Sequence, residues 1–495
     1  MTNNGLGSFK PINTGISGLD EILNGGLVPN RSYLVYGRPG TGKSTLSFQY
    51  LMQGVKNSEK VLYITLLQTR NEIREIFASH GWDIKGIEIA ELPKEIHEVS
   101  TSPQTIFSTA DIELNEISDS IVEMIKNHQP SRVVIDSLSE LYVLVDNPHQ
   151  FRQHLLKLKR LLNDMECTSI FTSGDSRDGD LDHIKTIVHG VIELSYEIPS
   201  YGMIRRRLSI LKMRGMVYRA GYHDFRILTG GLEVFPSMHL AGETSQTGFP
   251  VLKSENSQLD ELLGGGLQAG TTCLITGTSG AGKSILANQL VLAAANRGEK
   301  SSVFCFDERK EIFLRRAEGV GMPFEKLVQG KVIDLQQINV GDLSLGEFAF
   351  QVQESVERNR SEIVIIDSLS GYLNAMSEKN LVIPVLHELL GYLGKKGVLT
   401  VLIVTTSGLS SDSGFKIDTS YLADSVVLLR HFEAHGQVRR CIAVLKKRYG
   451  PHENTIRELS ITEKGIEIGQ PLSDFAGVLT GTPRYEGPHG KLLQK

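Results

Sequence analysis

The chain has 495 residues, of which 40% are hydrophobic and 22% are charged. This length is too great for one ordinary domain core, and the composition excludes both a disordered polymer and a coiled-coil rod. The 52 basic and 57 acidic residues give a net charge of −5, which argues against a protein whose whole surface binds nucleic acid or an anionic membrane.

Short apolar runs alternate with amphipathic stretches along the chain. This alternation predicts βαβ units with mostly parallel sheets. The predicted strands are 32–37, 61–66, 132–137 and 169–174 in the first half, and 272–277, 302–307, 363–368 and 401–406 in the second. Helices are predicted over 45–57 and 284–298. No uninterrupted apolar run of about 18 residues occurs, and the four cysteines lack metal-type spacing, so we expect a cytoplasmic protein with reduced cysteines.

The second half of the chain repeats the first. GLDEILNGGL at 18–27 recurs as QLDELLGGGL at 258–267, and GRPGTGKS at 37–44 recurs as GTSGAGKS at 277–284. Two further pairs of segments follow in the same order. RVVIDSLS in the first half matches IVIIDSLS in the second, and ILKMRG matches VLKKRYG. A repeat this long indicates two duplicated domains and not a solenoid. We expect domains at 1–235 and 251–484, a polar linker at 236–250 and a short tail at 485–495.

Each half contains the motif GxxxxGK[ST] between a predicted strand and a predicted helix. In this context backbone amides surround phosphates, the lysine reaches the β- and γ-phosphates, and the hydroxyl binds Mg²⁺. A glycine turn that matches by chance is the alternative, but two matches in register argue against it. The expected nucleotide-binding residues are Gly37, Gly40, Thr41, Gly42, Lys43, Ser44 and Thr45, and Gly277, Thr278, Ser279, Gly280, Ala281, Gly282, Lys283, Ser284 and Ile285.

An aspartate ends one apolar strand in each half, Asp136 in the first and Asp367 in the second. A strand-end aspartate near a P-loop can reach Mg²⁺, although it can also cap a following turn. The duplication favours the metal role. Together with Ser44 and Ser284, these aspartates are the candidate metal ligands.

The halves differ where a catalytic carboxylate is expected. FCFDER in the second half supplies Asp307 and Glu308, while YITLLQT in the first half supplies Leu67 and Gln68. A carboxylate can accept a proton from an attacking water or hydroxyl, whereas neither leucine nor glutamine is a base near neutral pH. A solvated turn pair is the alternative for Asp307 and Glu308.

Together these motifs resemble the KaiC family, the double-domain ATPases and autokinases of the circadian clock and their bacterial relatives. The resemblance spans about residues 14–484 and also includes HGWD at 80–83 and FRILTGGLEVFP at 225–236. It implies an α/β fold of two tandem RecA-like P-loop NTPase domains, each a mostly parallel sheet flanked by helices. It also implies ATP and Mg²⁺ as ligands, a homo-oligomer in the form of a hexameric ring, ATP turnover and phosphoryl transfer onto the protein itself.

The resemblance assigns further residues one by one. The paired catalytic glutamates of the family match Asp307 and Glu308, which act with Lys283, so we expect the chemistry in the second domain and ATP binding for assembly in the first. In the family a Lys-x-Arg pair reaches the phosphates bound by the neighbouring subunit, and this chain matches that pair in both halves. The alternative interpretation of these basic residues is that they are solvated side chains at a strand edge. The matching residues are Lys212 and Arg214 in the first half, and Lys446 and Arg448, as catalytic residues, in the second.

The phosphoacceptor pair of the family is altered in this chain. Ser420 matches the acceptor serine and Tyr421 takes the place of the threonine, in a segment where turn residues before a strand are the alternative. The resemblance also implies a KaiB-like or other signalling protein as partner.

Two other functions are open. A signalling scaffold with slow hydrolysis and no kinase role would agree with Leu67 and Gln68. A RecA-like DNA-dependent ATPase shares the fold, but the segment 173–186 is acidic on balance and RRR at 205–207 is isolated, so we expect neither a nucleic-acid nor a membrane partner.

Overall fold

The computed structural model describes residues 9–92, 109–143, 148–175, 180–199, 202–238, 248–306, 308–339, 341–375, 379–406, 420–434, 436–479 and 483–487. The chain divides into two compact units, one of residues 1–199 and 204–237 and the other of residues 200–203 and 238–495. No helix in the described ranges combines the length and the apolar character needed to cross a membrane.

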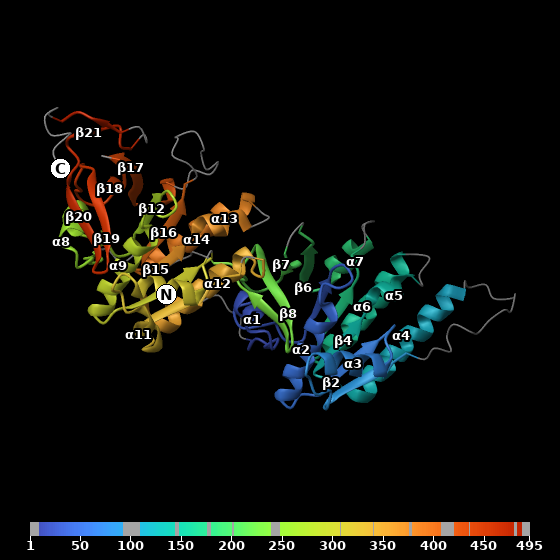
Figure 1. Ribbon diagram of the computed structural model, residues 1–495. Helices are drawn as coiled ribbons and strands as arrows, with labels where there is room; N and C mark the ends of the chain where they lie inside the picture. The colour runs from blue at the N-terminus through green and yellow to red at the C-terminus, as the bar shows by residue number, and fades with distance from the viewer. Residues whose placement is uncertain are drawn as a thin grey trace. The chain divides into compact units, whose positions relative to one another are not determined.

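The first unit alternates helices with parallel strands and then ends in a run of antiparallel strands (Figure 1). Its helices are α1 (Ser17–Ile22), α2 (Lys43–Lys56), α3 (Arg70–Ser79), α4 (Thr109–His128), α5 (Leu138–Val143), α6 (Pro148–Asp164) and α7 (Asp180–Ile187). Its strands are β1 (Ser32–Tyr36), β2 (Val61–Thr65), β3 (Ile87–Glu91), β4 (Arg132–Asp136), β5 (Thr168–Ser173), β6 (Gly190–Glu197), β7 (Arg205–Met213), β8 (Tyr222–Leu228) and β9 (Gly231–Phe235).

The strands of the first unit form one sheet in the order β3-β2-β4-β5-β1-β6-β7-β8-β9. The strands from β3 to β6 in this order are parallel, and β7, β8 and β9 continue the sheet antiparallel. Every residue of β1 is buried, as expected for a strand inside a sheet covered on both faces. Because parallel strands end at the same edge, this order brings the ends of β1, β2, β4 and β5 together.

The second unit repeats this plan (Figure 1). Its helices are α8 (Ser257–Leu262), α9 (Lys283–Asn296), α10 (Lys310–Glu318), α11 (Phe324–Gln329), α12 (Leu345–Asn359), α13 (Leu369–Ala375) and α14 (Lys379–Lys395), with the 3₁₀ turn η2 (Ser420–Leu422). Its strands are β10 (Val251–Leu252), β11 (Leu267–Gln268), β12 (Thr272–Gly277), β13 (Lys300–Cys305), β14 (Ile333–Gln337), β15 (Ser361–Asp367), β16 (Leu399–Thr405), β17 (Ser425–Ala434), β18 (Gln437–Lys447), β19 (Arg457–Thr462), β20 (Gly465–Pro471), β21 (Phe475–Ala476) and β22 (Arg484–Tyr485).

The main sheet of the second unit has the order β14-β13-β15-β16-β12-β17-β18-β19-β20, which matches the first sheet strand by strand. The predicted fold class, two tandem RecA-like α/β domains with mostly parallel sheets, is therefore confirmed. Each predicted strand and helix is present, with ends that shift by one or two residues. The sequence patterns do not predict the parallel strands β3, β6, β14 and β17, nor the antiparallel strands that follow β6 and β17.

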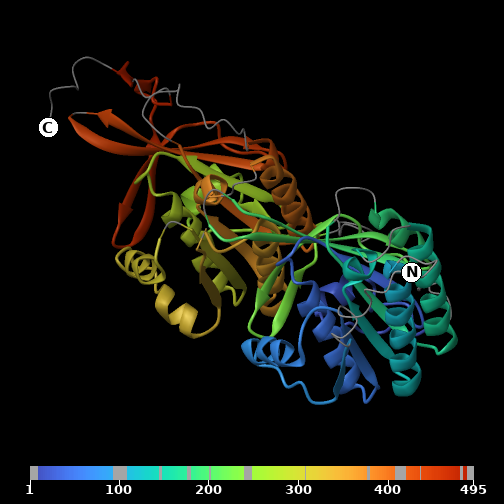
Figure 2. The ribbon, with the colours of Figure 1, turned by 90° about the vertical axis from the view of Figure 1, so that its right-hand side faces the viewer.

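Helices cover both faces of each main sheet (Figures 1 and 2). In the first unit α1, α2 and α3 pack on one face, and α4, α5 and α6 pack on the other. In the second unit α8 to α11 pack on one face, and α12, α13 and α14 pack on the other. Each fully buried leucine or phenylalanine of these clusters contributes about 1.5–3 kcal/mol, so the two faces fix the sheet that carries the P-loops.

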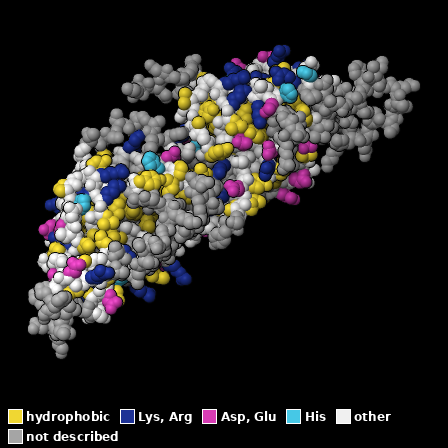
Figure 3. Space-filling view, turned by 90° about the horizontal axis from the view of Figure 1, so that it is seen from above, with side chains coloured by type: hydrophobic (Ala, Val, Ile, Leu, Met, Phe, Trp, Pro, Cys, Tyr) yellow, Lys and Arg dark blue, Asp and Glu magenta, His cyan; other side chains and the backbone are white. Residues whose placement is uncertain are grey.

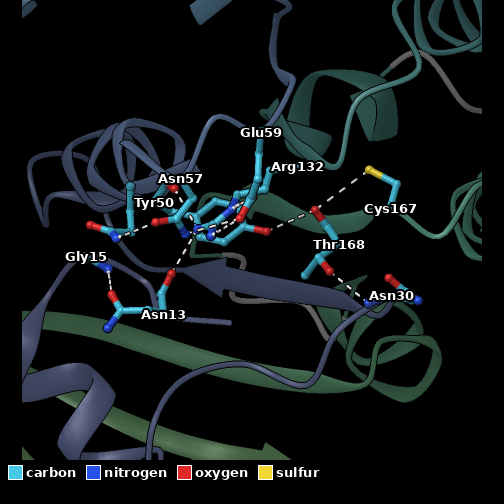
Figure 4. A network of polar contacts seen from close by, with 10 residues as sticks. Asn13, Gly15, Asn30, Tyr50, Asn57, Glu59, Arg132, Cys167 and Thr168 are labelled. Atoms are coloured by element: carbon cyan, nitrogen blue, oxygen red, sulfur yellow. Dashed lines mark hydrogen bonds and ion pairs between the residues drawn. The ribbon is translucent and has the colours of Figure 1, made fainter. Parts of the chain in front are cut away.

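An arginine is buried inside the first unit (Figure 4). Arg132, 1% exposed, pairs with Glu59 through two nitrogens and donates hydrogen bonds to the carbonyls of Asn13 and Tyr50 at 2.8 and 3.0 Å. Its guanidinium also lies 4.8 Å from the centre of the Tyr50 ring. The contacts join the start of β4 to α2 and to the N-terminal segment.

The single tryptophan of the chain also belongs to the first unit. Trp82 follows α3 and stacks on His80, with ring centres 4.6 Å apart and planes 24° apart. Its other neighbour is Phe77, at 5.6 Å in an edge-on arrangement. These contacts anchor the end of α3 to the core.

Candidate functional site

The first glycine of each P-loop occupies a position that no other residue fits. Gly37 has φ of 157° and Gly277 has φ of 153°. A Cβ on Gly37 would lie 2.1 Å from the carbonyl oxygen of Leu194, and one on Gly277 would lie 1.9 Å from that of Leu429. Both loops are thus pressed against the strand next to the P-loop strand, β6 and β17 respectively.

The helices after the P-loops begin without a side-chain cap. Gly42 and Gly282 are the N-cap residues of α2 and α9, with φ of 99° and 102°. By contrast, Thr69 and Ser344 close capping boxes on α3 and α12. The first amides of α2 and α9 therefore carry the partial positive charge of a helix start and have no side-chain acceptor, which suits a phosphate.

The two P-loop lysines fold back over their own loops. Lys43 Nζ donates to the carbonyls of Gly37 and Arg38 at 2.7 and 3.1 Å, and Lys283 Nζ donates to that of Thr278 at 2.8 Å. Burial lowers the pKa of both lysines, and the nearby strand-end aspartates oppose that shift. Each ammonium lies where it can meet an anion held by the loop.

The remaining predicted loop residues fall into two groups. Gly40, Ser279 and Gly280 are exposed at the tips of the loops. Thr41, Thr45 and Ala281 are buried beneath them, and Ile285 is half-buried on α9.

The structure joins Ser44 to Asp136 in the first unit. Ser44 Oγ donates to Asp136 Oδ2 at 2.7 Å. Two residues that the sequence did not single out donate to the same carboxylate, Tyr63 at 2.5 Å and Thr172 at 2.6 Å. Three donors thus orient this candidate metal ligand, as supporting hydrogen bonds do in metal sites generally.

The second unit holds its aspartate in a different setting. The backbone contacts of the two aspartates are alike, since the carbonyl of Asp367 accepts from the amide of Phe306 at 2.7 Å and that of Asp136 from Leu66 at 2.9 Å, so the difference lies in the neighbouring side chains. The positions that match Tyr63 and Thr172 in strand register are Val303 and Ile403, neither of which has a side-chain donor. Ser284 follows Lys283 in the first turn of α9.

The carboxylate that follows β13 is bound by an arginine. Glu308 accepts two hydrogen bonds from Arg316 on α10, at 3.1 and 2.5 Å, and both side chains are partly buried. Asp307 lies outside the described residues.

The first unit has neutral side chains at these positions. Leu67 is 65% exposed, and the backbone of Gln68 is held by Thr65 Oγ1. The Oε1 atom of Gln68 is buried and has no hydrogen-bond partner among the described residues. The candidate base of the second unit therefore corresponds to an amide in the first.

The structure places the Lys-x-Arg residues against backbone carbonyls near α7 in the first unit and before β17 in the second. Lys212 Nζ donates to carbonyls in the last turn of α7 and to that of Val188 just after it, at 2.8 Å, and burial lowers its pKa. Arg214 reaches the carbonyl of Thr186 at 3.4 Å. Lys446 donates to the carbonyl of Ala423 at 2.8 Å.

Arg448 lies beside the candidate phosphoacceptor segment. It pairs with Asp424 at 3.3 Å and donates to the carbonyl of Tyr421 at 3.3 Å. Tyr421 is half exposed in η2, where Ser420 is the first residue. Thr419 lies outside the described residues.

The donors of both sites fit a magnesium nucleotide. The loops offer helix-start amides and a lysine ammonium to phosphates, and a Cβ at Gly40 would meet no atom within 4 Å. A hydroxyl and a carboxylate oxygen, paired in the first unit as Ser44 and Asp136, are the hard ligands that Mg²⁺ takes. Tyr63, Thr172 and Arg316 are the residues that local motifs missed, because their partners emerge only from strand order and helix packing.

Comparison with known proteins gives the same family in both halves. The KaiC ATPase family model matches residues 12–239 and 252–473. The chain is similar to the circadian clock protein KaiC3 of Synechocystis sp., with 26% identity over 485 residues that cover 96% of this chain and 95% of that protein. It is also similar to the circadian clock oscillator protein KaiC of Synechococcus elongatus, with 28% identity over 486 residues that cover 96% and 92%.

Proposed function

The chain belongs to the KaiC family of ATPases, and from this membership we propose that its second unit turns over ATP and phosphorylates the protein itself, while its first unit binds ATP for assembly. The observation that carries this division is the difference between Glu308 and Gln68. Both residues follow the strand after the P-loop helix, but only the glutamate can accept a proton near neutral pH.

Glu308 is the proposed general base, with Asp307 as its neighbour in the same segment. In hydrolysis it takes a proton from water; in autophosphorylation the seryl oxygen of Ser420 bonds to the γ-phosphorus, the bond to ADP breaks and the proton passes to the carboxylate. Lys283 binds the transferred phosphate. Mg²⁺, when held by Ser284 and Asp367, neutralises charge on the phosphates.

The Lys-x-Arg residues support a ring in which each site is completed by a neighbouring copy. Lys446 and Arg448 bond to Ala423, Asp424 and Tyr421 in the segment before β17. A second copy placed against this edge would receive both cations at its phosphates, which stabilises transition-state charge. A homohexamer, with Lys212 and Arg214 in the same role between first units, is the assembly we propose.

A signalling scaffold is the second candidate, and Leu67 favours it. Its apolar side chain is 65% exposed where the second unit has a carboxylate segment, so the first unit offers a surface and no base there. In this alternative slow hydrolysis times the binding of a KaiB-like or other signalling protein.

A DNA-dependent ATPase is less well supported. On the face seen in Figure 3, Lys and Arg side chains gather in small groups between apolar and acidic side chains. A nucleic-acid surface instead needs a continuous basic stripe.

The experiment is ATP turnover with phosphosite mapping and native mass on variants of the full chain. Glu308→Gln and Lys283→Ala should lose most turnover and the phosphate on Ser420 but keep the assembled mass. Lys43→Ala should lose assembly at limiting ATP. As a matched gain-of-function control, Gln68→Glu in the Lys283→Ala background should restore part of the hydrolysis. ATP turnover that is lost in Lys43→Ala but retained in Glu308→Gln would contradict the proposed division of roles between the two units.

A further inference from the structure

The second residue of the P-loop differs between the two units, and so does its side-chain partner. The second residue of the first loop is Arg38, whose Nε lies 3.5 Å from Asp175 Oδ2. The second residue of the other loop is Thr278, whose Oγ1 lies 3.0 Å from His431 Nδ1. The first loop therefore has a permanent cation at this point, while the second has an imidazole.

His431 is part of a strand pair that contacts the second loop twice. It lies on β17 directly opposite Arg440 on β18. Arg440 Nε donates to the carbonyl of Gly280 at 3.2 Å. A Cβ on Gly280 would lie 3.8 Å from Cε1 of His431, so the imidazole lies beside the tip of the loop.

The first unit has a different residue at the matching place. The cross-strand pair there is Tyr196 and Arg206, in the same register beside the P-loop strand. A phenol does not change charge near neutral pH, whereas an imidazole does. A titratable charge beside the phosphate loop is thus a property of the second unit.

The groups that face His431 disfavour its protonated form in the chain alone. Burial lowers the pKa of His431, the guanidinium of Arg440 and the ammonium of Lys283 lower it further, and the carbonyl of Gly280 opposes the shift. Thr278 accepts or donates one hydrogen bond without adding charge. A polyphosphate in the loop would add negative charge near the imidazole, which favours its protonated form and raises its pKa.

We propose that His431 is a further nucleotide-binding residue of the second site, which takes up a proton when a polyphosphate enters the loop. This inference rests on the proposed function, in that the second P-loop binds ATP. It assigns a pH-dependent affinity to the second site and not to the first.

The direction of the effect follows from linkage. The pKa of the imidazole is higher in the complex than in the free chain, so the gain in affinity is complete below the free-chain pKa and is lost as pH rises through the pKa of the complex. A pKa rise of about one unit corresponds to a change of about tenfold in Kd. We therefore expect ADP to bind the second site about three- to tenfold more tightly at about pH 6 than at about pH 8.

The test uses the full chain with one site silenced at a time. Lys43→Ala leaves the second site, and titration calorimetry with magnesium and ADP in two buffers of different ionisation enthalpy measures proton uptake. Lys283→Ala leaves the first site, with Arg38 and Tyr196, as the matched control that reports the titration of ADP itself. Uptake should be greater at the second site by a fraction of a proton per ADP.

Two variants of His431 in the Lys43→Ala background complete the test. His431→Tyr introduces the residue of the first unit, and His431→Gln keeps a neutral hydrogen-bonding side chain in case the first variant does not fold. Either folded variant should show the pH dependence and proton uptake of the first site. Equal dependence at both wild-type sites, or dependence retained by the variants, would overturn the inference. Absence of ADP binding at the second site at every pH would instead overturn the proposed function.

Discussion

Arg316 binds both carboxylate oxygens of Glu308, with Nε 3.1 Å from Oε1 and Nη2 2.5 Å from Oε2. The same guanidinium lies 5.3 Å from the ring centre of Phe313, which is buried in the core. The guanidinium of Arg316 is thereby held against Phe313 while it presents a planar pair of donors to Glu308. A bidentate contact of this kind fixes direction as well as distance, so Arg316 is a positioning residue for the proposed base.

Replacement of Arg316 should lower the rate of ATP turnover. Ile76 occupies the corresponding place in α3, so Arg316→Ile introduces a residue that this fold already accepts. We expect kcat to fall about tenfold or more with little change in KM, because the lost contact orients the base and does not bind nucleotide. Arg316→Lys should recover part of the rate. Steady-state kinetics that show unchanged kcat in Arg316→Ile would contradict the assignment.

The donors around Asp136 should control Mg²⁺ binding in the first unit. Tyr63→Phe and Thr172→Val each remove one hydrogen bond to this carboxylate while preserving shape. Loss of such supporting bonds typically costs 10–100-fold in metal affinity, and we expect about tenfold for each variant. The measurement is the Mg²⁺ dependence of ADP binding in the Lys283→Ala background. Unaltered dependence in the double variant would show that the donors only stabilise the fold.

Alanine at the first glycine of the second P-loop should abolish nucleotide binding there. In Gly277→Ala the new Cβ would meet the carbonyl oxygen of Leu429 at 1.9 Å, so the loop must leave β17. Gly319→Ala is the matched control, because its φ of −61° suits any residue and its nearest atoms are 3.5 Å away. We expect Kd for ADP at the second site to rise at least tenfold in the first variant only. Tight binding by Gly277→Ala would refute the geometry.

The buried pair of Arg132 and Glu59 should make the first unit sensitive to substitution. Arg132→Met leaves a carboxylate without its partner in a half-buried position, and we expect a loss of about 3 kcal/mol in the free energy of unfolding. Adding Glu59→Gln should recover part of that loss. Urea unfolding followed by circular dichroism measures both changes, and a double variant less stable than Arg132→Met would argue against this explanation.

The same pair predicts a pH dependence of stability. Although burial raises the pKa of Glu59, the hydrogen bonds and charge of Arg132 lower it below the ordinary value of 4.5. The stabilisation is therefore fully present above about pH 4.5 and is lost as pH falls through the lowered pKa of the folded state. Calorimetric melting of the wild type should show this acid-sensitive step, and the step should be weaker in Glu59→Gln.

Short-range signals were sufficient to predict the four central parallel strands of each sheet and both P-loops, but not β3, β6, β14 and β17. Buried strands are continuous apolar runs, and the glycine and lysine spacing of the loops is local. The strand ends at Asp136 and Asp367 followed from the same runs.

The remaining parts of the site depend on neighbours that are distant in the chain. Tyr63 and Thr172 act on Asp136 only because β2, β4 and β5 are adjacent in the sheet. His431 meets Thr278 from β17, the strand beside the P-loop strand, whose buried and partly exposed residues alternate irregularly, so no simple pattern predicts the contact. Arg316 is closer in sequence, but its direction depends on how α10 packs through Phe313.

The stacking of Trp82 on His80 gives the protein an internal optical reporter. Since the chain has one tryptophan, fluorescence excited at the red edge of indole absorption comes from the first unit alone. Trp82 follows α3, which begins two residues after Gln68, so its emission will respond to movements of α3 and of the Gln68 segment before it. Tyrosines are present in both units. Comparison of the tryptophan and tyrosine emission during unfolding can therefore show whether the first unit opens before or after the rest of the chain, without an attached dye.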